Sequence, residues 1–264
     1  MEKINLINLR KLLTTEGLRK VPEITVFFWI IKLLTTAMGE STSDFLVHQI
    51  DPVIAVIMGA IGFGIAIALQ FWTRKYVAWV YWLAVTMVAI FGTMAADVVH
   101  IVLGVPYWLS AISFAIVLTV IFFIWHKTEQ TLSIHSILTP RREIFYWLAV
   151  ITTFAFGTAA GDMTAITFKL GYLASGILFA ILFGIPLVAY KLFGTKEVVT
   201  FWAAYIFTRP LGASFADWFG RTPNLGGIGF GTGRTTVVLT VFIIFLVLYL
   251  TITHQDIKNK RFLR

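Results

Sequence analysis

Hydrophobic residues in this chain come in long runs, without the alternating or one-sided pattern of a soluble core. Residues 53–72 read VIAVIMGAIGFGIAIALQFW and residues 236–253 read TVVLTVFIIFLVLYLTIT, and each run can cross ~30 Å of hydrocarbon as a helix. A β-barrel is excluded, because its strands would alternate polar and apolar residues. The pattern predicts an all-α polytopic membrane protein with eight transmembrane helices. The predicted spans are residues 24–48, 52–72, 77–103, 106–125, 143–168, 172–193, 198–219 and 235–253.

The four odd-numbered spans share one pattern: an aromatic residue, Trp, nine residues, Gly, four residues, Asp. Its members are Trp29/Gly39/Asp44, Trp82/Gly92/Asp97, Trp147/Gly157/Asp162 and Trp202/Gly212/Asp217. Four occurrences at one spacing predict tandem helical hairpins that all point the same way, in contrast to inverted repeats. The predicted repeats are residues 21–75, 76–127, 140–193 and 194–254. We expect them to form one transmembrane domain, residues 21–254, around a pseudo-fourfold axis.

Charge is scarce and unevenly placed. Of the 264 residues, 58% are hydrophobic and 13% are charged, and the net charge is +8. The basic residues gather in alternate loops and at the termini, so membrane topology explains them better than nucleic-acid binding does. The positive-inside rule then predicts that both termini are cytoplasmic. Residues 1–20 are predicted to be a basic amphipathic segment on the inner membrane face, and residues 255–264 a basic cytoplasmic tail.

The repeated glycines favour close packing of helices. Four residues after each glycine comes another small residue, a spacing that lets membrane helices approach closely. These small residues are Ser43, Ala96, Gly161 and Ala216. A packing role alone accounts for the glycines.

The repeated aspartates need another explanation, because packing does not require a charge at bilayer depth. Fifteen residues separate each Trp from its Asp, or roughly 22 Å along a helix. With each Trp at the inner interface, the four carboxylates would converge toward the outer side as one polar site. The alternative is that each Asp caps a helix end or pairs with its own base.

Further donors and one buried base accompany the aspartates. Glu40, Asp44 and His48 are spaced i, i+4, i+8, and Asp97 and His100 are spaced i, i+3, so each set shares a helix face. The predicted metal ligands are Glu40, Asp44, His48, Asp97, His100, Asp162 and Asp217. Arg209 is predicted either to offset one of these carboxylates or to form a fixed structural pair.

The segments FGTMAADVVH, GTAAGD and TRPLGASFADWFG resemble those of a bacterial family of multi-spanning proteins catalogued as uncharacterised membrane-anchored proteins. The resemblance extends over nearly the whole chain. It implies a polytopic fold in a bacterial inner membrane and carries no activity, so the functional hypotheses rest on the residues.

Three functions are compatible with this pattern. Intramembrane acids mark ion pathways and proton relays, and carboxylates without thiolates suit Mn²⁺ better than Cu⁺. The first hypothesis is therefore a secondary carrier or exporter of a divalent metal ion, coupled to protons, which is not an enzyme. The second is a structural or sensory membrane protein whose polar cluster only packs helices. The third, an intramembrane hydrolase, is weaker, because AAGD departs from the GxGD protease pattern. Beyond a metal ion or protons and the bilayer, no partner is indicated, and a homo-oligomer is left open.

Overall fold

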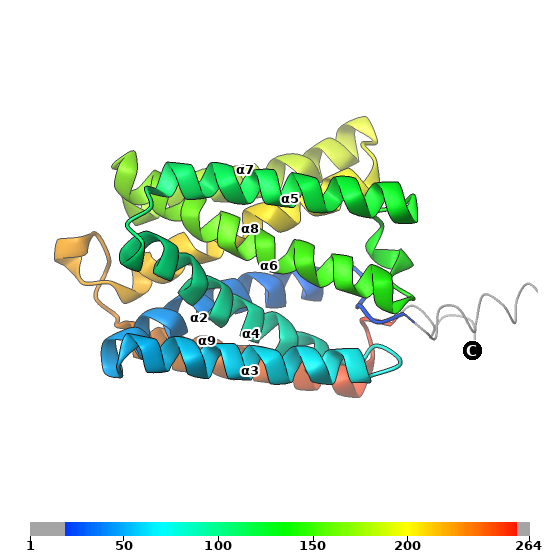
Figure 1. The fold of residues 1–264 in the computed structure, drawn as a ribbon, viewed down its shortest axis with the longest axis horizontal. Helices are drawn as coiled ribbons and strands as arrows, with labels where there is room; N and C mark the ends of the chain where they lie inside the picture. The colour runs from blue at the N-terminus through cyan, green and yellow to red at the C-terminus, as the bar shows by residue number, and fades with distance from the viewer. Residues whose placement is uncertain (1–18, 258–264) are drawn as a thin grey trace, which may run out of the picture.

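Residues 19–257 of the chain are described by a computed structural model (Figure 1). This part of the chain contains eight long helices, as the sequence predicted, and no strand. They are α2 (Val26–Gln49), α3 (Pro52–Trp72), α4 (Ala78–Asp97), α5 (Tyr107–Glu129), α6 (Pro140–Asp162), α7 (Gly171–Phe193), α8 (Glu197–Gly220) and α9 (Thr232–Thr253). The amphipathic segment expected over residues 1–20 and most of the tail expected over residues 255–264 lie outside the described residues.

The helix boundaries follow from local sequence signals. Thr25 caps α2 by accepting a hydrogen bond from the Phe28 amide, and Asp51 and Thr139 cap α3 and α6 in the same way. α3 and α6 also begin with proline, whose missing amide proton costs nothing in the first turn. Four short segments complete the secondary structure: π-helices η1 (Val98–Val102) and η3 (Met163–Thr167), and 3₁₀ helices η2 (Ile134–Ser136) and η4 (Pro223–Leu225).

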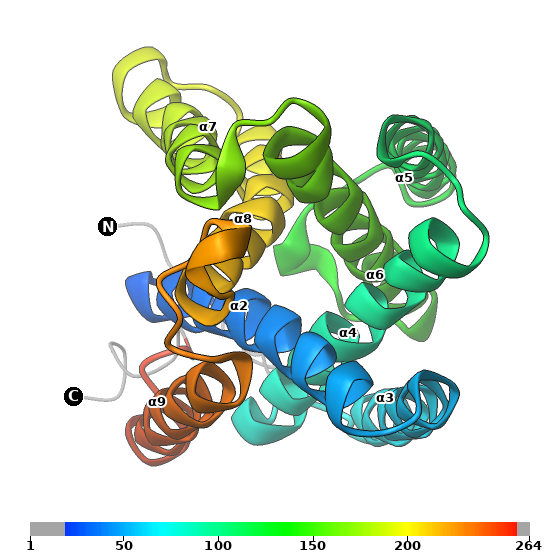
Figure 2. The same ribbon diagram turned by 90° about the vertical axis from the view of Figure 1, so that its left-hand side faces the viewer.

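The eight helices form two concentric layers. α2, α4, α6 and α8, the core helices, pack in a closed ring in which each contacts its two neighbours. α3, α5, α7 and α9, the outer helices, surround this ring (Figure 2). An outer helix packs chiefly on the core helix of the next repeat, so α3 covers α4, α5 covers α6, α7 covers α8, and α9 closes the cycle on α2. This cyclic packing gives the expected pseudo-fourfold arrangement.

The four repeat glycines lie at the seams of the ring. A Cβ atom on Gly92 would lie 3.1 Å from the Cβ of Phe154, and one on Gly157 would lie 2.5 Å from the Cγ of Arg209. Gly39 and Gly212 abut Ala89 and Thr36 still more closely. Each neighbour is the residue three positions before the glycine of the next repeat, and the fourth repeat contacts the first. The glycines therefore let four backbones approach one another around one axis.

Aromatic side chains fill the half of the ring where the core helices begin. Tyr81, Trp82, Tyr146 and Tyr205 are buried there, and the Tyr81 and Tyr146 hydroxyl oxygens are 2.5 Å apart. The repeat tryptophans were expected in an interfacial belt. Three of them, those of repeats two to four, are instead buried against other aromatic rings inside the bundle, because the ring around the axis needs large side chains to fill it.

The two ends of the bundle differ. We call the end where the core helices begin the terminal end, because residues 19–25 and 254–257 lie there, and the opposite end the acid end. At the terminal end, Lys20 Nζ donates to Glu143 Oε2 at 2.6 Å, and Gln70 Nε2 donates to Glu143 Oε1 at 3.0 Å. Tyr76 donates to Asp256 at 2.5 Å. Burial raises the pKa of the Asp256 carboxyl, and this hydrogen bond opposes the shift. These contacts join both ends of the described chain to the core and outer helices at the terminal end of the ring.

Candidate functional site

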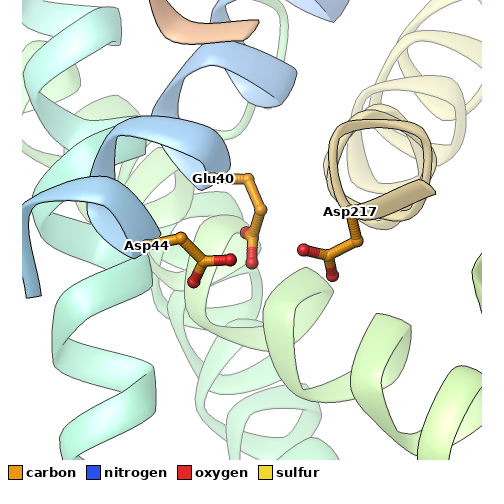
Figure 3. Close-up of side chains that lie close together, drawn as sticks. All are labelled: Glu40, Asp44 and Asp217. Atoms are coloured by element: carbon orange, nitrogen blue, oxygen red, sulfur yellow. The ribbon is translucent and has the colours of Figure 1, made fainter. Parts of the chain in front are cut away.

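Three carboxylates come together at the acid end of the ring. Glu40 and Asp44 lie one turn apart on α2, and Asp217 faces them from α8, so that one oxygen of each lies within 4.8 Å of the others (Figure 3). All three side chains are buried. We call this group the acid cluster. Within the described residues it is the one group of three or more acids and histidines close enough to share a metal ion.

The other two repeat aspartates lie beside the acid cluster. Asp97 at the end of α4 interacts electrostatically with Glu40, Asp44 and Asp217, and Asp162 at the end of α6 interacts with Glu40 and Asp97. Both side chains are partly exposed. Within residues 19–257, neither carboxylate forms an ion pair or a hydrogen bond. Five carboxylates therefore share one end of the ring, and two of them have no direct partner.

A π-helix follows each of the two unpaired aspartates. The amide of Leu103 donates to the Val98 carbonyl at 3.1 Å, and the amide of Phe168 donates to the Met163 carbonyl at 2.9 Å. Such i to i+5 turns inside helices are found frequently at functional sites. Repeats two and three thus end alike, whereas α2 and α8 stay α-helical past Asp44 and Asp217.

Arg209 lies at the centre of the ring, on the terminal side of the acid cluster. Its Nη2 donates to Glu40 Oε2 at 2.5 Å, to the Thr93 hydroxyl at 2.5 Å and to the Thr158 hydroxyl at 2.9 Å. Its Nη1 donates to the Thr36 carbonyl at 3.3 Å. Glu40, Thr93 and Thr158 each directly follow a repeat glycine. One fully buried guanidinium therefore links all four core helices.

A second arginine closes the acid cluster from the other side. Arg221, directly after α8, donates from Nε to Asp217 at 2.8 Å, and its Nη2 lies 3.1 Å from Asp44 Oδ2. Burial alone would lower the pKa of this guanidinium, but Asp217 and Asp44 raise it above its ordinary value. The loop that follows folds back on α8 through amide donors such as Ile228, which bonds the Trp218 carbonyl at 2.7 Å.

The two arginines leave half of the cluster oxygens free. Each of the three ion pairs occupies a single oxygen of its carboxylate, and the second oxygens are Glu40 Oε1, Asp44 Oδ1 and Asp217 Oδ2. These three accept no hydrogen bond from the described residues. A carboxylate can accept from several directions, so the cluster retains acceptors for a cation.

Lys32 is a third base inside the ring. Its Nζ lies 3.9 Å from the ring centroid of Phe154 and 4.2 Å from that of Tyr205. The side chain is fully buried, and its ammonium group donates no hydrogen bond to any described residue. Aromatic faces attract a cation, so the two rings hold Lys32 between Arg209 and the terminal end.

The two predicted histidine ligands lie away from the acid cluster. His48 is exposed, and its Nδ1 lies 2.6 Å from the carbonyl of Asp44 on its own helix. The His100 ring packs at a tilt against Tyr107, with the ring centroids 4.4 Å apart, and its Nδ1 lies 3.2 Å from the Val105 carbonyl. Its buried Nε2 contacts no polar group of the described chain. Of the seven predicted ligands, the five carboxylates therefore lie together at the acid end, and the two histidines lie at its rim.

The sequence analysis found the acids and Arg209, and it missed two bases, Arg221 and Lys32. Arg221 follows Asp217 by four residues, the spacing of an intrahelical ion pair, which was the available signal. Lys32 interrupts the apolar run FFWIIKLLTT, and a charge inside a span is itself a signal. Thr93 and Thr158 could be found only as the residues equivalent to Glu40 in repeats two and three.

These features define a polytopic helical membrane protein with a charged core. Six of the eight helices are long and apolar enough to cross a membrane, by length and composition. The other two, α2 and α8, are 24 residues each and carry the buried pair Glu40 and Arg209.

The chain belongs to the family described as Repeat of Unknown Function (DUF347). Its four matches cover residues 27–76, 80–131, 145–195 and 200–256. Each match contains one core helix and the outer helix that follows it, which confirms the resemblance to a repeated multi-spanning family. No curated protein and no solved structure matches the chain.

Proposed function

We propose that this protein is a secondary transporter of a divalent metal ion, exchanged for protons at the acid end of the ring. The observation that carries the proposal is a group of five carboxylates that interact electrostatically. Three oxygens of the acid cluster, and both Asp97 and Asp162, have no partner among residues 19–257. A structural cluster has no need of unpaired acids at this depth, where each charge is costly.

The donor set favours a hard cation. With both histidines outside the cluster, its side-chain donors are oxygens, which suit Mn²⁺, Mg²⁺ and Ca²⁺. Among these ions we propose Mn²⁺ as the substrate, since carboxylate oxygens without thiolates suit it.

Charge balance supports exchange with protons. Five carboxylates share the acid end with Arg209 and Arg221, and Lys32 lies beyond Arg209 toward the terminal end. When all eight groups are ionised, two negative charges are in excess. Either one divalent ion or two protons cancel that excess. Binding the metal ion would therefore displace protons, since a nearby cation favours the charged form of a carboxyl group.

The buried bases argue for a carrier rather than an open channel. Arg209 and Lys32 lie on the axis between the acid cluster and the terminal end, and positive charges in a pathway repel cations. Arg209 also holds the four core helices together through its hydrogen bonds. Passage of an ion would require this arginine to move, so transport would alternate between two arrangements of the ring.

Loop charges support an orientation. The loops at the terminal end carry Arg74 and Lys75, then Lys127, Arg141 and Arg142, then Lys191 and Lys196. At the acid end there are Lys169, Arg221 and Arg234. By the positive-inside rule the terminal end would face the cytoplasm of a bacterial inner membrane, and the acid cluster would load from outside.

One observation favours the second candidate, a structural membrane protein. Glu40, Asp44 and Asp217 all pair with an arginine, as acids that only join helices would. The two candidates differ over Asp97 and Asp162, which a structural role leaves idle.

The test is metal flux into proteoliposomes, measured for Mn²⁺, Mg²⁺, Ca²⁺ and Zn²⁺ in turn. The double variant Asp97→Asn/Asp162→Asn should keep its folded yield, because no ion pair is broken, and should lose Mn²⁺ flux. Asp51→Asn is the matched control: Asp51 is exposed at the same end, and asparagine caps a helix as well as aspartate does. Calorimetry in two buffers of different ionisation enthalpy would count the protons released. Full flux by the double variant would leave the aspartates as helix contacts.

A further inference from the structure

A long apolar groove runs along the outside of the ring, between α7 and α9. Its floor is the seam between α2 and α8, with Leu33, Ala37 and Leu211 among its residues, and Ala180 and Val238 form its two walls. Its volume is about 710 Å³. Figure 2 shows α7 and α9 on either side of this seam. We call it the α7–α9 groove.

The α7–α9 groove extends along the helix axes. At the acid end it reaches Phe219, two residues past Asp217, and on α2 it reaches Ile30, fourteen residues before the equivalent Asp44. Fourteen helical residues span roughly 21 Å. One leaflet of a bilayer with a ~30 Å core is about 15 Å deep, so the groove is longer than one leaflet is deep and can hold a whole acyl chain along the bilayer normal.

The lining residues favour an apolar occupant. All of them are apolar except Thr235, and the rim residues Ile30, Ile228 and Phe230 are substantially exposed. A transmembrane helix from a second copy, a cylinder ~10 Å wide, would occupy roughly 1,600 Å³ over this length, so it could lie only partly within the groove. The volume and length together fit acyl chains.

One charged residue stands at the acid-end mouth of the groove. Arg234 lies one turn before Val238 on α9, on the same helix face, and is exposed. It forms no ion pair with the described residues. A guanidinium above an apolar groove matches the phosphate above an acyl chain, because arginine binds phosphate oxygens in a bidentate manner.

We propose that the α7–α9 groove binds a phospholipid from the leaflet at the acid end, with an acyl chain along α2 and α8 and its phosphate at Arg234. The bound lipid would cover the seam whose inner side carries Glu40, Asp44 and Asp217. The proposal is independent of the transported ion, since it rests on the lipid-facing surface of the ring.

The test is native mass spectrometry of the full-length protein titrated with dioleoyl phosphatidylglycerol and, separately, with dioleoylglycerol, which lacks the phosphate. Ala180→Trp and Val238→Trp fill the groove from opposite walls at exposed positions. Each should weaken binding of both lipids at least about tenfold, because losing the burial of two methylene groups already exceeds a factor of ten. Ala174→Trp is the matched control, since Ala174 is exposed on the same helix and does not line the groove.

A second pair of variants tests the headgroup. Arg234→Gln should weaken phosphatidylglycerol binding about fivefold and leave dioleoylglycerol binding unchanged, whereas Lys169→Gln, at an exposed position of the same end, should alter neither. Equal binding by the parent and both tryptophan variants would mean annular lipid only and would overturn the proposal. Equal loss of both lipids in Arg234→Gln would overturn the phosphate contact.

Discussion

Arg209 shows how one residue can hold four repeats together. It occupies the position of Thr36, Ala89 and Phe154 in the other repeats, and it reaches the residues that follow three of the repeat glycines. A buried ion pair adds little stability compared with an apolar pair, but removing one partner leaves an uncompensated charge. Glu40 is therefore tolerated at bilayer depth because it pairs with Arg209, whose guanidinium also donates to the Thr93 and Thr158 hydroxyls.

We expect Arg209→Gln to destabilise the protein by about 3–5 kcal/mol, because Glu40 would remain buried without its counter-ion. Denaturant-induced unfolding of the purified protein, followed by tryptophan fluorescence, would measure this change. Arg221→Gln is the comparison. Arg221 pairs with two acids but is partly exposed, so its loss should lower the free energy of unfolding less. If both variants unfold at the same denaturant concentration as the parent, the buried pair is not a structural tie.

At the scale of the helices, the glycine seams determine how closely the core helices approach. Gly157 contacts Arg209 and Pro210, and a Cβ atom there would lie 2.9 Å from the Cδ of Pro210. Real Cβ atoms do not come so close, so a methyl group at this seam forces α6 and α8 apart. Gly64 on α3, in contrast, has open space around it.

Gly157→Ala should therefore lower the free energy of unfolding by about 1–3 kcal/mol through overpacking. Gly64→Ala should raise it by up to about 1 kcal/mol, because alanine is the better helix former. The same unfolding assay would measure both changes, which should have opposite signs. No change in the free energy of unfolding for Gly157→Ala would show that α6 and α8 do not meet through this face.

The π-helices are a further feature of the element scale. They follow Asp97 and Asp162, which pair with no described residue, whereas α2 and α8 stay α-helical after Asp44 and Asp217, the two acids bound by Arg221. The four repeats thus pack in the same way but differ at their aspartates: those of repeats one and four are bound by Arg221, and those of repeats two and three precede a π-helix. This division is the reason to test Asp97 and Asp162 together.

At the scale of the whole molecule, the cyclic packing requires the core helices to be parallel. Both described ends of the chain then lie at the same face of the bundle (Figure 1), and every second loop lies there too. The basic loops of that face predict that it is cytoplasmic.

Topology reporters fused after Lys75, Arg142, Lys196 and Arg264 should all report the cytoplasm. A fusion after Leu103, in the loop between η1 and α5 at the acid end, should report the opposite side and serves as the control. One clear extracellular signal among the first four would contradict an even number of spans between these loops.

The sequence by itself determined the helices, the repeats and the level of the acids. Long apolar runs predict spans directly, since backbone groups in hydrocarbon must be satisfied within a helix, and a fixed Trp–Gly–Asp spacing places equivalent residues at equal depth. The eight predicted spans accordingly agree with the observed helices within a few residues. The π-helices were missed, because a single wide turn leaves no periodic signal.

Only the tertiary structure decided which charges meet. Ring closure brings α8 against α2, so Asp217 joins Glu40 and Asp44 although more than 170 residues separate them in the chain. The same closure places Arg209 among three other repeats and turns Arg221 from a loop base into a partner of two acids. Helical spacing shows which side chains lie on the same face of one helix. Contacts across the ring depend on the order and rotation of the helices, which the hydrophobic pattern alone does not define. Because the rotation of α2 and α4 about their axes could not be predicted, His48 and His100 were expected among the ligands, and they lie at the rim instead.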